Sequence, residues 1–209
     1  MADVAADGSG DGLSACVRTA TAPLHARIEA LAGLPDAVRD RQDYRRLLEC
    51  LFGLYEPLER SFQRFGDWEG LGLDLSERNH ACRLSRDLAA LGTDVPGLPR
   101  AGPGRLPDLP AFPHALGAFY VLEGSTLGGR IILRALDSRL GPQIAGATRF
   151  LAGHGGATGP MWIAFRTALD GFGRVRPDAC DAVLSGAERT YGAILSWFAQ
   201  DRAAGAVQS

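Results

Sequence analysis

Apolar residues recur at spacings of three and four along most of this chain, whereas clean alternation of apolar and polar residues is hard to find. The first spacing keeps apolar side chains on one face of an α-helix, while alternation would mark a half-buried strand. The pattern therefore predicts an all-α fold. The expected helices cover residues 13–32, 41–65, 76–91, 113–139, 159–171 and 178–200.

Residues that favour helix starts stand near four of these boundaries. We expect Ser76 to cap the third helix, Pro113 to open the fourth, Thr158 to begin the fifth and Pro177 to precede the last. Small polar side chains accept hydrogen bonds from the free amides of a first turn, and proline fits there because it has no amide hydrogen to place.

The segment between the third and fourth helices is rich in proline, and the residues concerned are Pro96, Pro99, Pro103, Pro107, Pro110 and Pro113. So many prolines exclude a helix and favour an extended strap over the surface. The helices on the two sides of this strap would expose apolar faces if they did not pack on each other. We therefore expect one helical domain over residues 13–200, between a flexible polar tail, 1–12, and a C-terminal tail, 201–209.

Composition narrows the class of protein further. The chain has 209 residues, 46% hydrophobic and 22% charged, which is typical of a globular domain. A formal net charge of −2 gives no general attraction to nucleic acid or to an anionic membrane. The longest apolar stretch, residues 115–122, is far shorter than the ~20 residues of a membrane span. The four cysteines are widely spaced and no secretory signal precedes them, so we expect reduced thiols in a cytoplasmic protein.

The first candidate site lies on the helix expected at 13–32. At about 100° per residue, Arg18, His25 and Glu29 fall within about 40° of one another, along the edge of an apolar stripe. This edge could hold heme, with the imidazole on iron, the carboxylate on the other ring nitrogen and the arginine on a propionate. The alternative is a structural histidine with an ordinary partner one turn away. Pro23 could also bend this helix and move Arg18 off the line.

The second candidate site is a face without side chains on the helix expected at 113–139. Gly117, Gly124 and Gly128 fall within about 40° on this helix, and each interior glycine costs roughly 0.5–1 kcal/mol relative to alanine. A bare face allows close approach either of another helix or of a flat ligand. Hydroxyl groups that could serve such a ligand stand beside it on Tyr120, Ser125 and Thr126.

Other candidate metal sites have fewer supporting residues. Residues 77–80 form a single E-x-x-H, the unit of helical di-iron sites, but no second copy is present. His80 with Cys82, and His154 within its glycine-rich loop, lack the partners of a zinc site.

The sequence contains no dinucleotide-binding or phosphate-binding glycine motif and no serine-nucleophile motif. The cluster Arg41, Arg45 and Arg46 is most simply a solvated helix face, and docking of an acidic redox partner is the functional alternative.

Together, the two candidate sites resemble the heme oxygenase family. Residues 24–29, L-H-A-R-I-E, resemble the family's proximal helix, and residues 120–129, Y-V-L-E-G-S-T-L-G-G, resemble its distal helix. With G-G-A-T-G-P-M-W at residues 155–162, the likeness is greatest to the bacterial branch that accompanies bacteriophytochromes. It extends from about residue 13 to 200, and the distal motif is its most specific part.

The resemblance implies a helical bundle in which heme is both cofactor and substrate. His25 would bind the iron and Glu29 would hold its ring. Gly124, Gly128 and Gly129 would form the distal face, with Ser125 or Thr126 near the bound oxygen. Arg18 and Tyr120 would contact the propionates. Mammalian members have an aspartate at the position of Ser125, so the delivery of protons must differ here.

The implied activity is the cleavage of heme with O2 and external electrons to biliverdin, iron and CO. A ferredoxin or a reductase would donate the electrons, and a bacteriophytochrome could receive the bilin. Three alternatives stay open on the residues alone: a heme carrier or sensor without turnover, an enzyme of the related thiaminase-like type, and a bundle that serves only in protein interaction.

Overall fold

The computed structural model describes residues 12–207, and side chains as far as residue 200. Within this range the chain forms α-helices, short 3-10 turns and loops but no strand, which confirms the predicted all-α class. The helices are α1 (Leu13–Ala32), α2 (Arg41–Phe62), α3 (His80–Ala90), α4 (Phe112–Ile144), α5 (Arg149–Ala152), α6 (Thr158–Val175) and α7 (Cys180–Val207). No described helix is long and apolar enough to cross a membrane.

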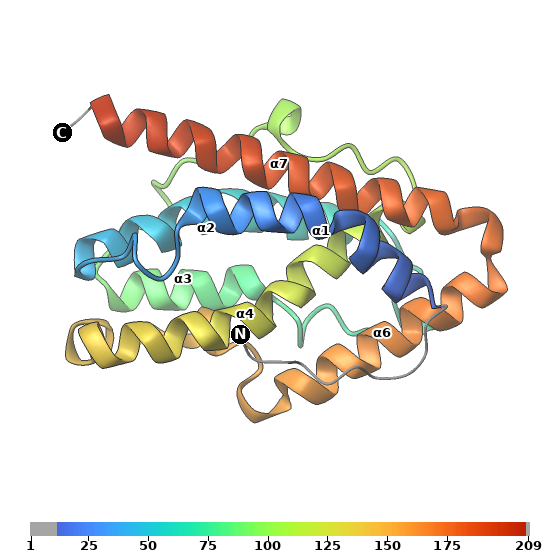
Figure 1. The fold of residues 1–209 in the computed structure, drawn as a ribbon, viewed down its shortest axis with the longest axis horizontal. Coiled ribbons are helices and arrows are strands. Elements are labelled where there is room, and N and C mark those ends of the chain that lie inside the picture. Colours follow the sequence, from blue (N-terminus) through green and yellow to red (C-terminus); the bar gives the residue numbers. More distant parts are fainter. Residues whose placement is uncertain (1–11, 208–209) are drawn as a thin grey trace.

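The helices pack into one bundle around a shared apolar core (Figure 1). Helix α7 runs along the length of the bundle and packs against both α1 and α4, while α2 packs against α3. Because α1 and α4 rest on the same helix, residues about one hundred positions apart in the sequence line one side of the bundle. This arrangement of helices positions the candidate site.

The contact between α4 and α7 depends on two glycines. A Cβ atom added at Gly117 would lie 1.8 Å from the carbonyl oxygen of Val183, and one added at Gly186 would lie 2.0 Å from that of His114. No side chain fits at such distances, so the two helices touch through their backbones. For Gly117, close helix packing is therefore the correct interpretation of the bare face, and this glycine takes no part in a ligand site.

Several predicted helix boundaries need correction: the helices expected to end at 65, 139 and 171 end at Phe62, Ile144 and Val175. Asn79, not Ser76, caps α3, because its side-chain oxygen accepts a hydrogen bond from the amide of Cys82. Ser76 lies in a turn where its own amide donates to Asp74. Glu77 therefore precedes the helix, so the E-x-x-H pattern does not lie on one helical face. At the other end of the chain, α7 continues past residue 200 to Val207, into the expected C-terminal tail.

The proline-rich segment forms the predicted extended strap. Between α3 and the start of α4, the described segment 95–111 contains a single short 3-10 turn, Pro103–Arg105, and is otherwise without helix. The strap is fixed to α2, because the amide of Ala101 donates a 2.8 Å hydrogen bond to the carbonyl oxygen of Gly53, and it buries Leu109 in the core. The expected flexible tail, 1–12, lies outside the described residues except for Gly12.

Candidate functional site

A cavity of about 570 Å³ opens between α1 and α4 and is completed by residues of α2, α5, α6 and α7. This volume is in the range of sites that bind a small molecule or a cofactor. The cavity brings the two candidate sites of the sequence together. Of the predicted site residues, the following line it: Arg18, His25, Glu29, Tyr120, Gly124, Ser125, Gly128 and Gly129.

His25 lies on the α1 side of the cavity. Its Nδ1 atom is 3.6 Å from Oε2 of Glu29, and its ring meets the ring of Tyr191 edge-on, with centroids 6.1 Å apart. The imidazole side chain is 55% exposed, so it is accessible from the cavity. Among the described residues no hydrogen bond engages Nε2, which leaves this nitrogen as the available ligand atom.

On the opposite side, residues 124–129 of α4 form a surface with few side chains, which we call the glycine wall. A Cβ atom added at Gly128 would meet nothing within 4 Å, so a side chain there would project into open space at the cavity. A Cβ atom at Gly124 would touch the ring of Trp162 at 3.4 Å. Gly129 has a second role, because a Cβ there would lie 3.0 Å from the carbonyl oxygen of Leu151 in α5.

Thr126 does not belong to the lining of the cavity. Its side chain is buried, and its hydroxyl donates a 2.6 Å hydrogen bond to the carbonyl oxygen of Glu123 in the preceding turn. Two residues along a helix correspond to about 200°, so Thr126 points away from the side that Gly124 presents. Ser125 is the hydroxyl residue of the motif that does line the cavity.

Ser125 has a partner from α2 that sequence reasoning missed. The phenol of Tyr55 donates a 3.2 Å hydrogen bond to Oγ of Ser125, which in turn donates to the carbonyl oxygen of Leu122. Burial raises the pKa of Tyr55 to about 12, so its hydroxyl keeps its proton at neutral pH. Tyr55 lines the cavity beside Ser125, but nothing in the sequence sets it apart from the other apolar and aromatic residues of α2.

One part of the cavity wall combines aromatic rings with a cation. Tyr120 is 7% exposed, its ring packs against that of Trp162 at 5.2 Å, and both side chains line the cavity together with Arg18. Burial raises the pKa of Tyr120, while the positive charges of Arg18 and Arg166 oppose that rise. A guanidinium beside a protonated phenol is suited to bind a carboxylate.

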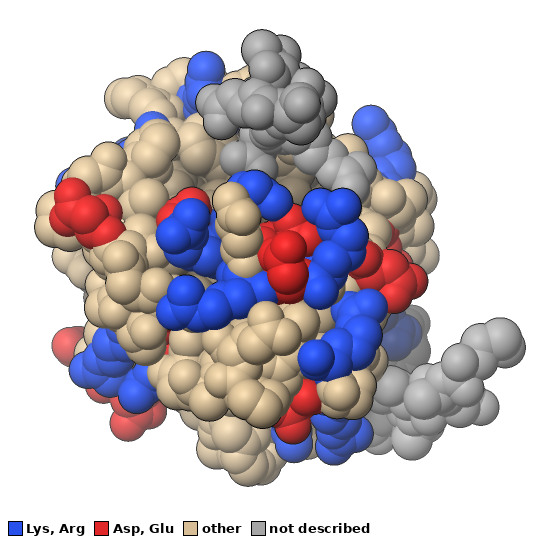
Figure 2. All heavy atoms as spheres, turned by 90° about the vertical axis from the view of Figure 1, so that its left-hand side faces the viewer, with Lys and Arg blue, Asp and Glu red and all other residues tan. Residues whose placement is uncertain are grey.

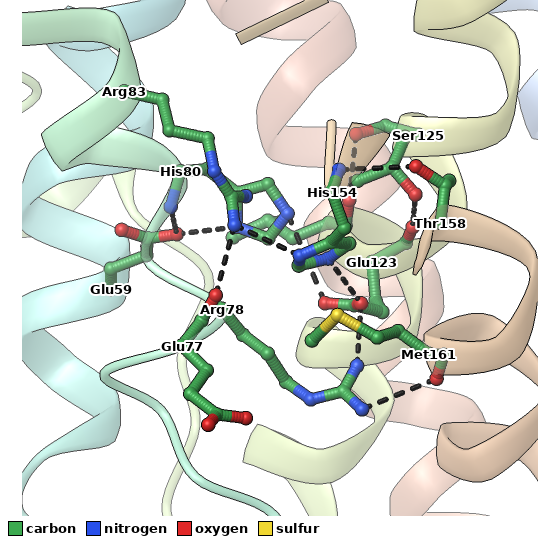
Figure 3. A network of polar contacts seen from close by, with 12 residues as sticks. Glu59, Glu77, Arg78, His80, Arg83, Glu123, Ser125, His154, Thr158 and Met161 are labelled. Atoms are coloured by element: carbon green, nitrogen blue, oxygen red, sulfur yellow. Dashed lines mark hydrogen bonds and ion pairs between the residues drawn. The ribbon is translucent and has the colours of Figure 1, made fainter. Parts of the chain in front are cut away.

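A second group of polar residues meets around Glu123 of α4 (Figure 3), and none of its members lines the cavity. We call it the polar cluster, and its members are Glu59, Arg78, His80, Arg83, Glu123 and His154. The sequence offered no way to join these residues, because they come from α2, from the start of α3 and the turn before it, from α4 and from the loop before α6. His80 and His154, each without partners in the sequence, thus meet at Glu123.

His80, Glu123 and His154 present possible metal-ligand atoms within 4.8 Å of one another. Two guanidinium groups already bind atoms of this group, although Nε2 of His80 and Oε2 of Glu123 have no hydrogen-bond partner among the described residues. Arg78 donates to Oε1 of Glu123, and Arg83 donates to Nδ1 of His154. A divalent cation would face these two positive charges at short range, so electrostatics favours a hydrogen-bonded network over a metal site.

Arginines mixed with acidic residues gather at the end of the molecule shown in Figure 2. This is the left-hand end of Figure 1, where α2 begins and α4 ends. The arginines noted in the sequence at the start of α2 are engaged: Arg41 donates to two backbone carbonyls, and Arg45 and Arg46 pair with acidic residues one turn away. They join segments of this end as well as facing the solvent.

No protein-family model matches this chain, and no curated protein matches it either. The arrangement of side chains therefore carries the functional argument. The cavity offers an imidazole on one wall, a wall with few side chains opposite, a cation with a phenol beside them, and a hydrogen-bonded pair of hydroxyl groups.

Proposed function

We propose that this protein is a heme oxygenase of the bacterial type, which binds heme between α1 and the glycine wall and opens its ring with O2 and electrons from an external donor. The observation that carries the proposal is the position of His25 and Gly128 on the same cavity, one with a free imidazole nitrogen and the other facing open space. A flat macrocycle with a central metal could be held by this combination of a histidine ligand and a bare opposite wall.

Heme would supply the iron that takes up electrons and O2 and the ring that is opened to biliverdin, with release of Fe(II) and CO. His25 would bind the iron through Nε2. Glu29 would hold the other ring nitrogen, which fixes the orientation of the imidazole. A neutral imidazole donates less electron density to iron than a thiolate does, so it favours attack on the macrocycle over O–O cleavage of the kind that thiolate ligation promotes.

The glycine wall would determine how close the distal side of the cavity comes to the ring. Gly128 leaves the space into which a larger residue would project, and the Trp162 ring lies beside Gly124 at the cavity. Because backbone atoms rather than side chains would face the ring there, the wall could approach the ring closely.

The polar residues of the cavity would orient the ring and hold protons. Arg18 is positioned to bind a propionate, with Tyr120 as a second hydrogen-bond donor. The hydroxyl oxygens of Ser125 and Tyr55 lie 3.2 Å apart, and both groups carry a proton that could serve the distal wall. They would take the place of the acidic group that mammalian heme oxygenases have at the position of Ser125.

The proposal is tested by adding one equivalent of hemin to the purified protein and recording the absorption spectrum, then supplying ascorbate or a ferredoxin system in air. We expect the spectrum of a histidine-ligated heme that decays into biliverdin absorption. Absence of saturable heme binding would refute the proposal and would leave the cavity to another ligand. In the cell, a ferredoxin or a reductase would donate the electrons, and a bacteriophytochrome would receive the bilin.

A heme carrier or sensor is the second candidate function. The observation that favours it is the lack of a carboxylic acid on the glycine wall, where Ser125 supplies only a hydroxyl. A carrier needs the same His25 and the same bare wall but no source of protons. It would give a stable heme complex that never opens in the same experiment.

A further inference from the structure

The burial of helix α4 changes after Glu123. Residues 115–123 are buried without interruption, whereas from residue 124 onward several residues line the cavity and the helix becomes partly exposed, with Leu127 39% and Ile131 68% exposed. The glycine wall itself has few side-chain anchors, since Gly128 has open space beside it and Gly124 touches a single ring. Its position depends on the buried Thr126, on the hydrogen bond between Tyr55 and Ser125, on the packing of Gly129 against Leu151 and on the contacts of Glu123 directly before it.

At the N-terminal end of the wall, Glu123 is held from several directions (Figure 3). Its side chain is completely buried, and Oε1 accepts hydrogen bonds from Nη1 of Arg78 at 2.5 Å and from Nε2 of His154 at 2.8 Å. Arg78 also donates to the carbonyl oxygen of Met161 in α6. One carboxylate thus joins α4 to the turn before α3, to the loop before α6 and, through Arg78, to α6.

The hydrogen-bond partners assign the protons of His154. Arginine can only donate, so Arg83, which lies 2.9 Å from Nδ1, requires a lone pair on that nitrogen. The proton of a neutral His154 is then on Nε2, where it is donated to Glu123. Both nitrogens of His154 are in use, and neither is free for a metal or a ligand.

His80 faces the same carboxylate from α3. Glu59 accepts hydrogen bonds from the backbone amides of His80 and Ala81, and one of its oxygens lies 2.7 Å from Nδ1 of His80, which assigns a proton to Nδ1. Nε2 of His80 then lies 3.9 Å from Oε2 of Glu123, and both atoms are buried. A carboxylate flanked in this way cannot shift along α4 without breaking bonds to buried groups, which is costly.

We propose that Glu123, gripped by Arg78 and His154 and faced by His80, is a positioning residue that fixes the distance between the glycine wall and the ligand in the cavity. This inference rests on the proposed function for the identity of the ligand. The contacts of Glu123 just described, which we call the clamp, are present in the ligand-free protein. Loss of the clamp is expected to loosen residues 124–131 and to change how distal ligands bind, while coordination by His25 on α1 stays the same.

The test compares three variants. Glu123→Leu combined with Arg78→Met removes the clamp without leaving a buried charge unpaired. Glu123→Gln keeps its shape and an acceptor for Arg78 and His154, and its amide can donate to Nε2 of His80. Asp43→Asn is the matched control, because Asp43 is also a buried carboxylate with arginine partners but is not part of the cavity.

Amide hydrogen exchange in the ligand-free protein is the first readout. We expect exchange in residues 124–131 to rise about tenfold in the double variant, to stay close to that of the unchanged protein in Glu123→Gln, and to be unaffected by Asp43→Asn. If the double variant lowers the melting temperature as Asp43→Asn does and leaves exchange at the wall unchanged, the cluster serves only stability and the inference is wrong. Should the double variant not fold, His154→Ala removes one partner and no charge, and unchanged exchange there would equally overturn the inference.

The second readout uses CO on the reduced heme complex as a probe of the distal side. The double variant is expected to shift or split the C–O stretching band and to change the ratio of biliverdin isomers, with an unchanged iron–histidine stretching frequency. Loss of stability alone would not move the C–O band of the folded fraction, so an unchanged band would count against the clamp. If the unchanged protein binds no heme, the proposed function fails, while hydrogen exchange still decides whether the clamp exists.

Discussion

The Nδ1 atom of His25 lies 3.6 Å from Oε2 of Glu29, one helical turn further along α1. At this distance the two groups attract each other electrostatically without a short hydrogen bond. With Nδ1 turned toward Glu29, the other ring nitrogen is the one available for coordination. A small rotation of either side chain would bring the pair to hydrogen-bond distance, the arrangement in which a carboxylate supports a metal-binding histidine.

Replacement of His25 by alanine is expected to abolish coordination of the heme iron and to reduce turnover by more than the roughly 10–100-fold that loss of a supporting partner costs. The absorption spectrum of the hemin complex measures the first effect, and the rate of biliverdin formation measures the second. Added imidazole should restore both in part. His114→Ala is the control, since His114 does not line the cavity. Turnover by the His25 variant without imidazole would exclude this residue as the ligand.

Gly128 and Gly192 are both helical glycines with open space where a Cβ would be, but only Gly128 lines the cavity. We expect alanine at either position to raise the free energy of unfolding by about 0.5–1 kcal/mol, because alanine favours helix more than glycine does. Gly128→Leu should in addition weaken heme binding at least about tenfold by filling the space beside the wall, whereas Gly192→Leu should not. Urea unfolding and hemin titration measure the two effects. Equal heme affinity in the two leucine variants would contradict a role for Gly128 in the wall.

Replacement of Gly117 by alanine should destabilise the protein, in contrast to the same replacement at Gly128. A Cβ at this position would lie 1.8 Å from the carbonyl oxygen of Val183, so Gly117→Ala must push α4 and α7 apart. Forced overpacking of this kind costs about 1–3 kcal/mol, which exceeds the gain in helix propensity. The midpoint of urea unfolding is therefore expected to fall. A stabilised Gly117→Ala protein would mean that the backbones of the two helices do not touch there.

The features that local spacing controls could be predicted from the sequence. The helical class follows from the apolar period, and the placement of His25 and Glu29 on one edge follows from a separation of four residues. The bare face on α4 was recognisable from its glycines, but the sequence did not show that these glycines meet different partners. Gly117 packs on α7 while Gly128 faces the cavity, and the sequence carries no sign of which partner each glycine meets.

The polar cluster could not be predicted, because its residues meet only after α2, α3, α4 and the loop before α6 have packed together. Glu123 was visible as part of the distal motif, yet its burial and its bonds to Arg78 and His154 depend on tertiary packing. The wrong cap at Ser76 has a related cause. Both Ser76 and Asn79 are good capping residues, and only the amide of Cys82 within reach of Asn79 decides between them.

Tyrosine ionisation should limit stability at high pH. The chain has four tyrosines and no lysine, and burial raises the pKa of each tyrosine in the folded protein. Unfolded tyrosines ionise near pH 10, so their contribution to stability is complete below that pH and is lost as the pH rises toward the folded pKa values, about 12 for Tyr55. The free energy of unfolding should therefore fall above pH 10, by up to about 1.4 kcal/mol per pH unit for each tyrosine.

Absorbance at the wavelength of tyrosinate checks this expectation directly. The folded protein should show little tyrosinate at pH 10, whereas the protein in concentrated urea should show about half of its tyrosines ionised. Substantial tyrosinate in the folded protein at pH 10 would contradict the burial of these phenols.

Tyr55 and Ser125 should act as a unit in catalysis. The phenol donates to the serine hydroxyl at 3.2 Å, and both side chains line the cavity, so either Tyr55→Phe or Ser125→Ala removes the same hydrogen bond. We expect each variant to slow conversion of bound heme to biliverdin about tenfold, the factor that about 1.4 kcal/mol represents. Because the residues are in contact, the double variant should be little slower than either single one. Single-turnover absorption kinetics with a fixed concentration of ascorbate measure all four proteins. Rates that multiply in the double variant would show that the two hydroxyl groups act independently, and unchanged rates would place the source of protons outside this pair.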